Sequence, residues 1–282
     1  MPRPLDGDRP TLTAPPLTTD THMHFFLPGY DGQPGGPPLP EMASIEDYAV
    51  VRRRLGIERV IAVQPNAYQA DNSCLLHCLR QLGDIARGVA VVTPDTTEDE
   101  LQSLHDAGIR GARIMNLPGG AIGLDRMQEV ESLVRPLGWH LIVQFDGRNI
   151  LEYLPLLRGL QGRFIVDHIG KFLEPVPTDA PSFLELKRLL DSDRCYLKLA
   201  GCYETSKTGA PKFDDVGRLA ADLIAHAPER MIWGSNWPHI GVSADRYPDD
   251  AQLLDVLGDW TGNDPALLHR ILVETPAELY GF

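Results

Sequence analysis

Eight short apolar stretches alternate with stretches of helical character along the chain, and this alternation constrains the fold most strongly. Strands are expected at residues 18–26, 59–65, 86–94, 110–116, 140–146, 163–168, 195–201 and 230–239. Helices are expected at about 44–55, 72–83, 97–107, 124–137, 150–160, 181–191 and 214–226, with closing helices at 249–260 and 264–273. Strand–helix alternation predicts a parallel sheet covered on both faces. Eight such units predict an α/β fold closed into a TIM-type (β/α)8 barrel.

The length of 282 residues suits one barrel of roughly 250 residues with a short arm. Residues 1–17 are rich in proline, aspartate and threonine and are expected to form a flexible arm, disordered or extended. Residues 18–282 are expected to form a single barrel domain. The loop at residues 28–40 contains five prolines and four glycines. It is either a functional loop at the barrel mouth or a tolerated surface insertion.

The composition excludes several classes of protein. A net charge of −13 disfavours nucleic-acid binding, which needs basic surfaces. No apolar run reaches the roughly 18 residues of a membrane helix, and the N-terminus lacks an apolar signal segment, so a cytoplasmic protein with no membrane contact is expected. The four cysteines show no zinc-knuckle spacing and are interpreted as free thiols. No glycine-rich dinucleotide motif follows the first strand, and no cofactor is expected. Protein partners cannot be inferred from the sequence.

Polar residues gather where the expected strands end. In a parallel barrel these carboxyl ends meet on one face, which carries the active site. Residues two positions apart on a strand point the same way, so His22 and His24 are expected to face one pocket. The other candidates at or just after strand ends are Gln64, Asn66, Arg113, Asn116, Gln144, Asp146, His168, Lys171, Lys198, Tyr203, Glu204, Asn236 and His239.

The His22-x-His24 pair allows two interpretations. With His168 as a third ligand it would bind zinc, since three protein ligands suffice for a catalytic site. Alternatively, the histidines act as hydrogen-bonding or acid–base groups without metal. The last expected strand offers Asn236, and an amide neither ligates metals well nor acts as a general base at neutral pH. We therefore predict a site without metal.

Three cations are expected near the barrel mouth of this acidic chain. Arg113, Lys171 and Lys198 would hold carboxylates of an anionic ligand, and the guanidinium of Arg113 is suited to bidentate pairing. The alternative is that they pair with Asp146, Asp167 or Glu204 inside the protein.

Three stretches of the sequence resemble the amidohydrolase superfamily. They are Thr-Asp-Thr-His-Met-His (19–24), Val-Asp-His-Ile-Gly-Lys (166–171) and Trp-Gly-Ser-Asn-Trp-Pro-His (233–239). The chain is most similar to the branch that includes the 2-pyrone-4,6-dicarboxylate lactonases, with further likeness at residues 111–121, 143–147, 200–206 and 226–230. The resemblance extends from about residue 18 to the C-terminus.

The resemblance implies a distorted (β/α)8 barrel that works without metal on a small anionic lactone. Lactonases of this branch carry an aspartate, thought to activate water, where this chain has Asn236. Its absence implies an isomerase that moves the acyl group of a sugar-acid lactone between its own hydroxyls. The expected catalytic residues are His22, His24, His168 and Asn236. The expected substrate-binding residues are Gln64, Asn66, Arg113, Gln144, Lys171, Lys198, Tyr203 and His239. The alternatives are a lactone hydrolase, with or without zinc, and a non-catalytic sugar-acid binding protein.

Overall fold

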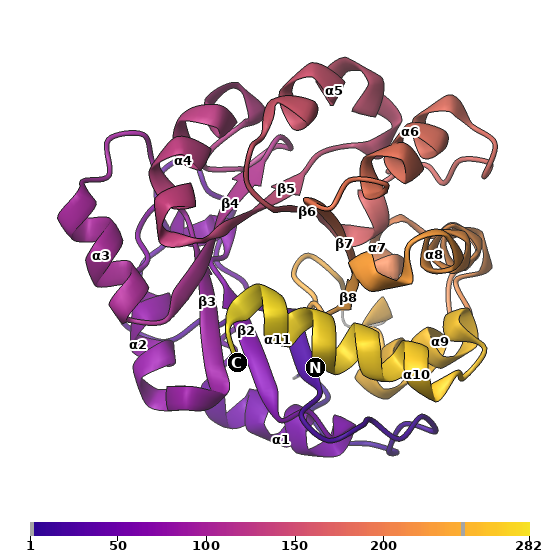
Figure 1. The fold of residues 1–282 in the computed structure, drawn as a ribbon. Coiled ribbons are helices and arrows are strands. Elements are labelled where there is room, and N and C mark those ends of the chain that lie inside the picture. The colour runs from indigo at the N-terminus through magenta and orange to yellow at the C-terminus, as the bar shows by residue number, and fades with distance from the viewer. Residues whose placement is uncertain (1–2, 244–245) are drawn as a thin grey trace.

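The protein folds into a (β/α)8 barrel, as the alternation predicts. The computed structural model describes residues 3–243 and 246–282, so residues 1–2 of the expected arm and 244–245 of the expected barrel lie outside the described residues. Eight parallel strands follow one another around a single sheet, and Figure 1 shows them encircled by the helices. The strands are β1 (Thr19–Met23), β2 (Arg59–Val63), β3 (Ala86–Ala90), β4 (Ile109–Met115), β5 (His140–Gln144), β6 (Phe164–Val166), β7 (Cys195–Leu199) and β8 (Met231–Trp233).

The barrel closes between β1 and the segment that follows β8. Met23 and Trp237 form a parallel bridge. The backbone N–H of Asn236 donates to the carbonyl of His22 at 2.8 Å, and that of His24 donates to the carbonyl of Trp237 at 2.8 Å. Closure therefore fixes Asn236 directly beside the two histidines.

The helices lie close to their expected positions. They are α1 (Ile45–Leu55), α2 (Ser73–Leu82), α3 (Glu98–Asp106), α4 (Met127–Val134), α5 (Ile150–Gly159), α6 (Pro181–Leu190), α8 (Asp214–His226), α9 (Asp250–Thr261) and α10 (Pro265–His269). Capping boxes at Ser44 and Thr97 satisfy free backbone N–H groups and start α1 and α3. Two helices were not expected, α7 (Cys202–Thr205) and α11 (Thr275–Tyr280). The first is a single turn after β7, too short to leave a periodic pattern.

The strands are shorter than the apolar stretches suggested. β6 and β8 contain three residues each, and most of the predicted polar site residues lie just past the strand ends. In those segments the backbone no longer pairs with the neighbouring strands, and it carries polar side chains over the open end of the barrel. β1 likewise departs from regular pairing with β2, because its register shifts between Asp20 and Met23.

The barrel interior is apolar at its base. Side chains from alternating strand positions fill it, and Tyr280 of α11 packs against them from below; the group comprises Ile61, Val63, Val89, Ile142, Ile165, Tyr196, Ile232, Leu279 and Tyr280. In Figure 1, α11 crosses the near end of the barrel beside both termini. The open end, where the site can form, is therefore the opposite one.

The described part of the N-terminal arm, residues 3–17, is extended and packs against the barrel. Leu12 is buried, and its N–H donates to Asp255 of α9 at 2.8 Å. Arg3 donates to the carbonyl of Met42 at 2.9 Å. Within the described residues, no helix combines the length and the apolar character needed to cross a bilayer.

Candidate active site

Inward-facing positions on neighbouring strands build the site. Arg113 pairs in register with Ile142, a residue of the apolar interior, so Arg113 and Gln144 both face inward. By the same alternation Lys198, which pairs with Ile232, faces inward from β7. Charged side chains thus form a layer directly above the apolar base.

A cavity of about 230 Å³ opens above this layer. Its volume lies below the roughly 300–1,000 Å³ typical of sites for drug-sized ligands, so it suits a small molecule. The polar side chains that line it are His24, Asn66, Arg113, Gln144, His168, Lys171, Glu204 and Asn236. Prolines 37, 38 and 40 of the long loop line it too, so this loop forms part of the site.

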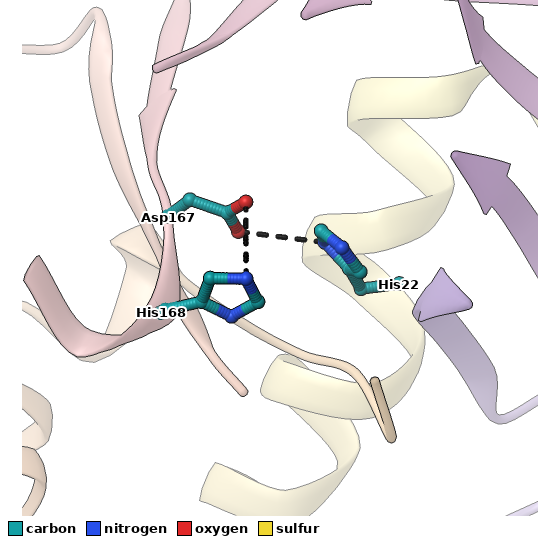
Figure 2. Close-up of side chains that lie close together, drawn as sticks. All are labelled: His22, Asp167 and His168. Carbon is teal, nitrogen blue, oxygen red and sulfur yellow. Dashed lines mark ion pairs between the residues drawn. The ribbon is translucent and has the colours of Figure 1, made fainter. Parts of the chain in front are cut away.

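A buried cluster of His22, Asp167, His168 and Lys198 lies at the floor of the cavity. Figure 2 shows the Asp167 carboxylate facing both imidazoles, 3.5 Å from His22 Nδ1 and 3.6 Å from His168 Nε2. The Lys198 ammonium lies 2.9 Å from His22 Nδ1 and 3.5 Å from Asp167 Oδ1. Asp167, His22 and Lys198 are all fully buried. The positive charge of Lys198 therefore compensates the negative charge of Asp167.

The hydrogen bonds of this cluster fix the positions of the imidazole protons. His24 Nδ1 lies 2.8 Å from the carbonyl of Val63, which can only accept, so Nδ1 carries the proton. His24 Nε2 must then accept from His22 Nε2, 3.2 Å away. His22 Nδ1 is left unprotonated and accepts from Lys198. A continuous chain therefore runs from Lys198 through both histidines to the backbone of β2.

Burial keeps the histidines neutral. It lowers the pKa of His24 to about 3, with a further contribution from the Arg113 guanidinium. It also lowers the pKa of His168 to about 3, aided by Lys171 and Lys198. Burial likewise lowers the pKa of Lys198 and of Lys171 to about 8 each. At neutral pH the site thus contains uncharged imidazoles beside cationic side chains.

Arg113 is a buried cation without an ionic partner within salt-bridge distance among the described residues. Its guanidinium donates to the carbonyl of Gln64 at 2.9 Å and to Gln144 Oε1 at 3.0 Å. Its Nε is buried and has no hydrogen-bond partner. A buried charge that is only partly satisfied favours an incoming anion.

Asn236 is held by a hydrogen-bond network behind the cavity wall. Its amide Nδ2 donates to the Tyr203 hydroxyl at 2.8 Å and to Glu204 Oε1 at 2.9 Å. The Tyr203 hydroxyl donates in turn to His239 Nδ1 at 2.9 Å, and His239 Nε2 donates to Asp250 at 2.9 Å. The other oxygen of Glu204 forms an ion pair with Lys171. This arrangement leaves the amide oxygen of Asn236 as an acceptor for a ligand hydroxyl.

Several site residues have strained backbone conformations. His168, Lys171, Asn236 and His239 all have positive φ angles, between 46° and 61°, although none is glycine. Such conformations cost about 1–3 kcal/mol each and cluster at functional sites. The strain in the segments after β6 and β8 is thus consistent with a site built for function.

The cluster at the cavity floor does not fit a metal ion as it is arranged. The possible ligand atoms of His22, Asp167 and His168 all lie within 4.8 Å of one another, so donors of the kind that zinc prefers do gather there. The Lys198 ammonium, however, contacts two of these ligands. The positive charge at this position is thus already supplied by a lysine.

Most of the residues predicted from the sequence converge, but not all of them line the cavity. Seven of the expected catalytic and substrate-binding residues line it. His22 and Lys198 lie directly beneath it. Gln64 is fully buried and its amide donates to the backbone at Gln69 and Asp71. Tyr203 and His239 line neighbouring cavities and reach this one only through Asn236. Their roles in binding remain predictions.

Two carboxylates of the site, those of Asp167 and Glu204, were not assigned a catalytic or binding role from the sequence. They were considered as ion-pair partners, and the structure pairs them with Lys198 and Lys171. The expected alternative of internal ion pairing therefore holds for both lysines but not for Arg113. The position of Asp167 directly before His168 was the signal that could have placed it in the cluster.

Comparisons with known proteins agree with this geometry. A family model described as amidohydrolase matches residues 19–282.

The chain belongs to the amidohydrolase family.

Two curated relatives are similar over nearly the full length of this amidohydrolase. D-galactarolactone isomerase from Agrobacterium fabrum is 42% identical over 99% of this chain and 96% of that protein. 4-Sulfomuconolactone hydrolase from Rhizobium radiobacter is 32% identical over 96% of this chain and 92% of that protein. A crystal structure of an Agrobacterium tumefaciens protein in its apo form has a TM-score of 0.95 at 42% identity, with 99% of each chain covered. This amidohydrolase is thus an enzyme whose relatives act on lactones.

Proposed function

We propose that this amidohydrolase is a metal-independent isomerase that converts D-galactaro-1,5-lactone into D-galactaro-1,4-lactone, in the oxidative breakdown of galacturonate in the cytoplasm. The similarity to D-galactarolactone isomerase, 42% over 99% of the chain, supports it. The observation that carries it is the amide of Asn236 at the end of β8. A neutral amide cannot take a proton from water, whereas ring transfer consumes no water.

The reaction is an intramolecular acyl transfer. The 4-hydroxyl of the substrate attacks the C1 carbonyl, a tetrahedral oxyanion forms, and the 5-oxygen leaves as a hydroxyl. The protein has to orient the two hydroxyls, stabilise the oxyanion and exclude water. The small cavity, covered by the long proline-rich loop, supports this role.

The substrate retains a free carboxylate, and Arg113 is the group suited to bind it. Its hydrogen bonds go to the neutral oxygens of Gln64 and Gln144, so the carboxylate would supply the missing counter-charge. Asn66 and Gln144 line the same wall and would bind ligand hydroxyls. The substrate is thereby oriented with its carboxylate toward β4 and its reacting carbons toward β8.

His24, His168 and Asn236 would act on the reacting oxygens. All three line the cavity, and the low pKa values of the two histidines keep their rings uncharged. The neutral imidazole of His168, whose Nδ1 has no hydrogen-bond partner among the described residues, can polarise a carbonyl by hydrogen bonding without competing for the substrate anion. His22 would fix the ring of His24, and Lys198 would supply the fixed positive charge at the cavity floor. We therefore propose catalysis without a metal ion.

A lactone hydrolase is the second candidate, because two 4-sulfomuconolactone hydrolases and a 2-pyrone-4,6-dicarboxylate hydrolase are 30–32% identical to this chain. It differs from the isomerase in its product.

NMR of D-galactaro-1,5-lactone incubated with the protein distinguishes them. The 1,4-lactone should accumulate at a rate proportional to enzyme concentration, unchanged by prior treatment with a chelator. Formation of only the open diacid would support the hydrolase, and activity lost to the chelator and restored by zinc would contradict catalysis without metal.

A further inference from the structure

We propose that Glu204 is the acid–base catalyst of this site, taking the proton from the attacking hydroxyl and returning it to the leaving ring oxygen. The assignment rests on the proposed function and adds a residue to it. From the sequence, Glu204 was a candidate after the seventh strand and a possible ion-pair partner but was given no catalytic role, and the proposal follows from its position in the structure.

Glu204 lies in the cavity wall between Asn236 and Lys171. It belongs to α7, directly after β7, and its side chain is 21% exposed. Of the described residues that line the cavity, it is the sole carboxylate. One oxygen accepts a hydrogen bond from Asn236 Nδ2 at 2.9 Å, and the other is paired with Lys171. The carboxylate is thus fixed in orientation and open to a ligand.

Gly201 allows this convergence. A Cβ at Gly201 would lie 2.9 Å from His168 Nδ1, 3.4 Å from Asn236 Nδ2 and 3.4 Å from the Glu204 carboxyl carbon. Gly201 also has a φ angle of 64°, which favours glycine. The three side chains therefore approach one another around a position that has no side chain of its own.

The other cavity residues are poor proton acceptors. The pKa values of His24 and His168 lie near 3, and His24 Nε2 already accepts from His22. Asn236 is a neutral amide, and Lys171 and Arg113 are cations. Asp167 is fully buried beneath the cavity. Glu204 is therefore the group that can both receive and release a proton at the substrate.

The proton balance of the transfer closes with this one group. As the O4–C1 bond forms, the hydroxyl proton moves to the Glu204 carboxylate and the C1 oxygen becomes an oxyanion. Protonation weakens the ion pair with Lys171, so the ammonium can stabilise the oxyanion. As the C1–O5 bond breaks, Glu204 gives the proton to O5 and pairs with Lys171 again. No water or other reactant is consumed.

Glu204 also gives a reason for the amide at position 236. A carboxylate at this position would place two negative groups within hydrogen-bond distance, where one of them must take up a proton. An asparagine instead donates a hydrogen bond to the Glu204 carboxylate and keeps it ionised. The presence of Asn236 and the role of Glu204 are thus physically linked.

The test compares three variants with the wild-type chain on the 1,5-lactone. Glu204→Gln keeps the shape and removes the base, so kcat should fall by about 10²–10⁴-fold, the usual contribution of acid–base catalysis. The acidic limb of the pH–rate profile should disappear with it, while KM changes little. Glu204→Asp should keep the acidic limb of the pH–rate profile, with a lower kcat than the wild type. Glu174→Gln is the matched control, because Glu174 forms an exposed ion pair with Lys207 at 3.0 Å and its loss should leave kcat unchanged.

A Glu204→Gln variant with kcat within a few-fold of wild type, or with the wild-type acidic limb, would overturn the assignment while the isomerase itself stands. A wild-type chain that forms no 1,4-lactone would overturn the proposed function and this assignment together. The thermal midpoint of each variant shows whether a loss of rate comes from unfolding.

Discussion

Arg113 shows most directly how the site opposes the overall charge of the protein. The chain has a net charge of −13, yet this guanidinium is buried and its hydrogen bonds go to uncharged acceptors, the oxygens of Gln64 and Gln144 and the sulfur of Met115. Keeping a cation in this state costs free energy, which an anionic ligand recovers on binding. The residue is therefore better explained by a ligand than by stability.

Replacing Arg113 by methionine should lower kcat/KM for the 1,5-lactone by about a hundredfold or more. The reason is the loss of a charged, bidentate contact worth about 3 kcal/mol. The kcat/KM of Arg113→Lys should lie between those of the wild type and Arg113→Met, because lysine keeps the positive charge but lacks the two parallel N–H donors of the guanidinium. Steady-state kinetics of both variants measure the effect, and a near wild-type kcat/KM in Arg113→Met would refute the carboxylate site.

Changing Asn236 to aspartate should slow isomerisation by about tenfold or more, the equivalent of a shift of one pKa unit. The new carboxylate would face Glu204, since Nδ2 and Oε1 are 2.9 Å apart, and would repel the developing oxyanion. It would also offer water a base, so slow formation of the open diacid should appear. NMR of both products gives the two rates, and an unchanged isomerisation rate would contradict the role given to the amide.

The individual site residues could be predicted from the sequence because strand ends in a parallel barrel share one face. His24, Arg113 and Asn236 all reach the cavity in this way. The partners in the ion pairs could not be predicted. Lys198 meets Asp167 only because both side chains point into the barrel, one from β7 and the other from the segment after β6. Tyr203 follows β7 yet turns behind Asn236, since the unexpected helix α7 redirects the chain.

At the scale of elements, Asp20 joins β1 to the segment that follows β8 and to helix α1 of the outer layer. Its carboxylate accepts from the N–H groups of His22 and Ser235 at 3.0 and 2.9 Å, from the Ser235 hydroxyl at 2.5 Å, and from the Tyr48 hydroxyl of α1 at 2.8 Å. Strict alternation would have turned Asp20 inward with His22. Instead Asp20 contacts α1, and β1 has a register shift between Asp20 and Met23, which a sequence pattern does not reveal.

Asp20→Ala should lower the free energy of unfolding by about 3 kcal/mol or more, because several buried donors would lose their acceptor. Urea denaturation followed by circular dichroism measures the change. Asp84→Ala serves as the control, since Asp84 is exposed and should matter little. If Asp20→Ala were as stable as the control, Asp20 would not be the closing contact described above.

At the scale of the whole molecule, the order of the elements followed from the sequence and the ends of the strands did not. Apolar periodicity identified eight strands because each is buried on both faces. The same periodicity could not show that β6 and β8 end after three residues. The segments that follow these two strands are also buried, and their amino-acid composition resembles that of a strand. The arm, in turn, packs through single residues such as Leu12, a contact too sparse to form a pattern.

Stability should decline in mild acid because several histidines are buried in neutral form. The pKa values of His24, His140 and His168 are lowered from 6.5 to about 3, first by burial. Between these values the unfolded chain binds more protons than the folded one, so the free energy of unfolding falls as pH falls. From pH 7.5 to 5.5 the loss should be about 1.4 kcal/mol per histidine, or about 4 kcal/mol for these three, and His22, whose pKa is also lowered by burial, adds to it.

Urea denaturation at the two pH values tests this, and His140→Leu provides the internal comparison. His140 lies at the closed end of the barrel and neither ring nitrogen has a hydrogen-bond partner. Its removal should reduce the pH-dependent loss by about 1.4 kcal/mol while leaving the active site in place. An unfolding free energy that is the same at both pH values would show that these histidines are not buried as neutral groups.

The proposed enzyme moves an acyl group within its substrate without consuming water. Running D-galactaro-1,5-lactone with the enzyme in ¹⁸O-labelled water and analysing the first product by mass tests this most directly. The account predicts a 1,4-lactone of unchanged mass, with labelled diacid appearing only at the uncatalysed rate. Label incorporated at the enzyme-catalysed rate would contradict the account and identify the protein as a lactone hydrolase.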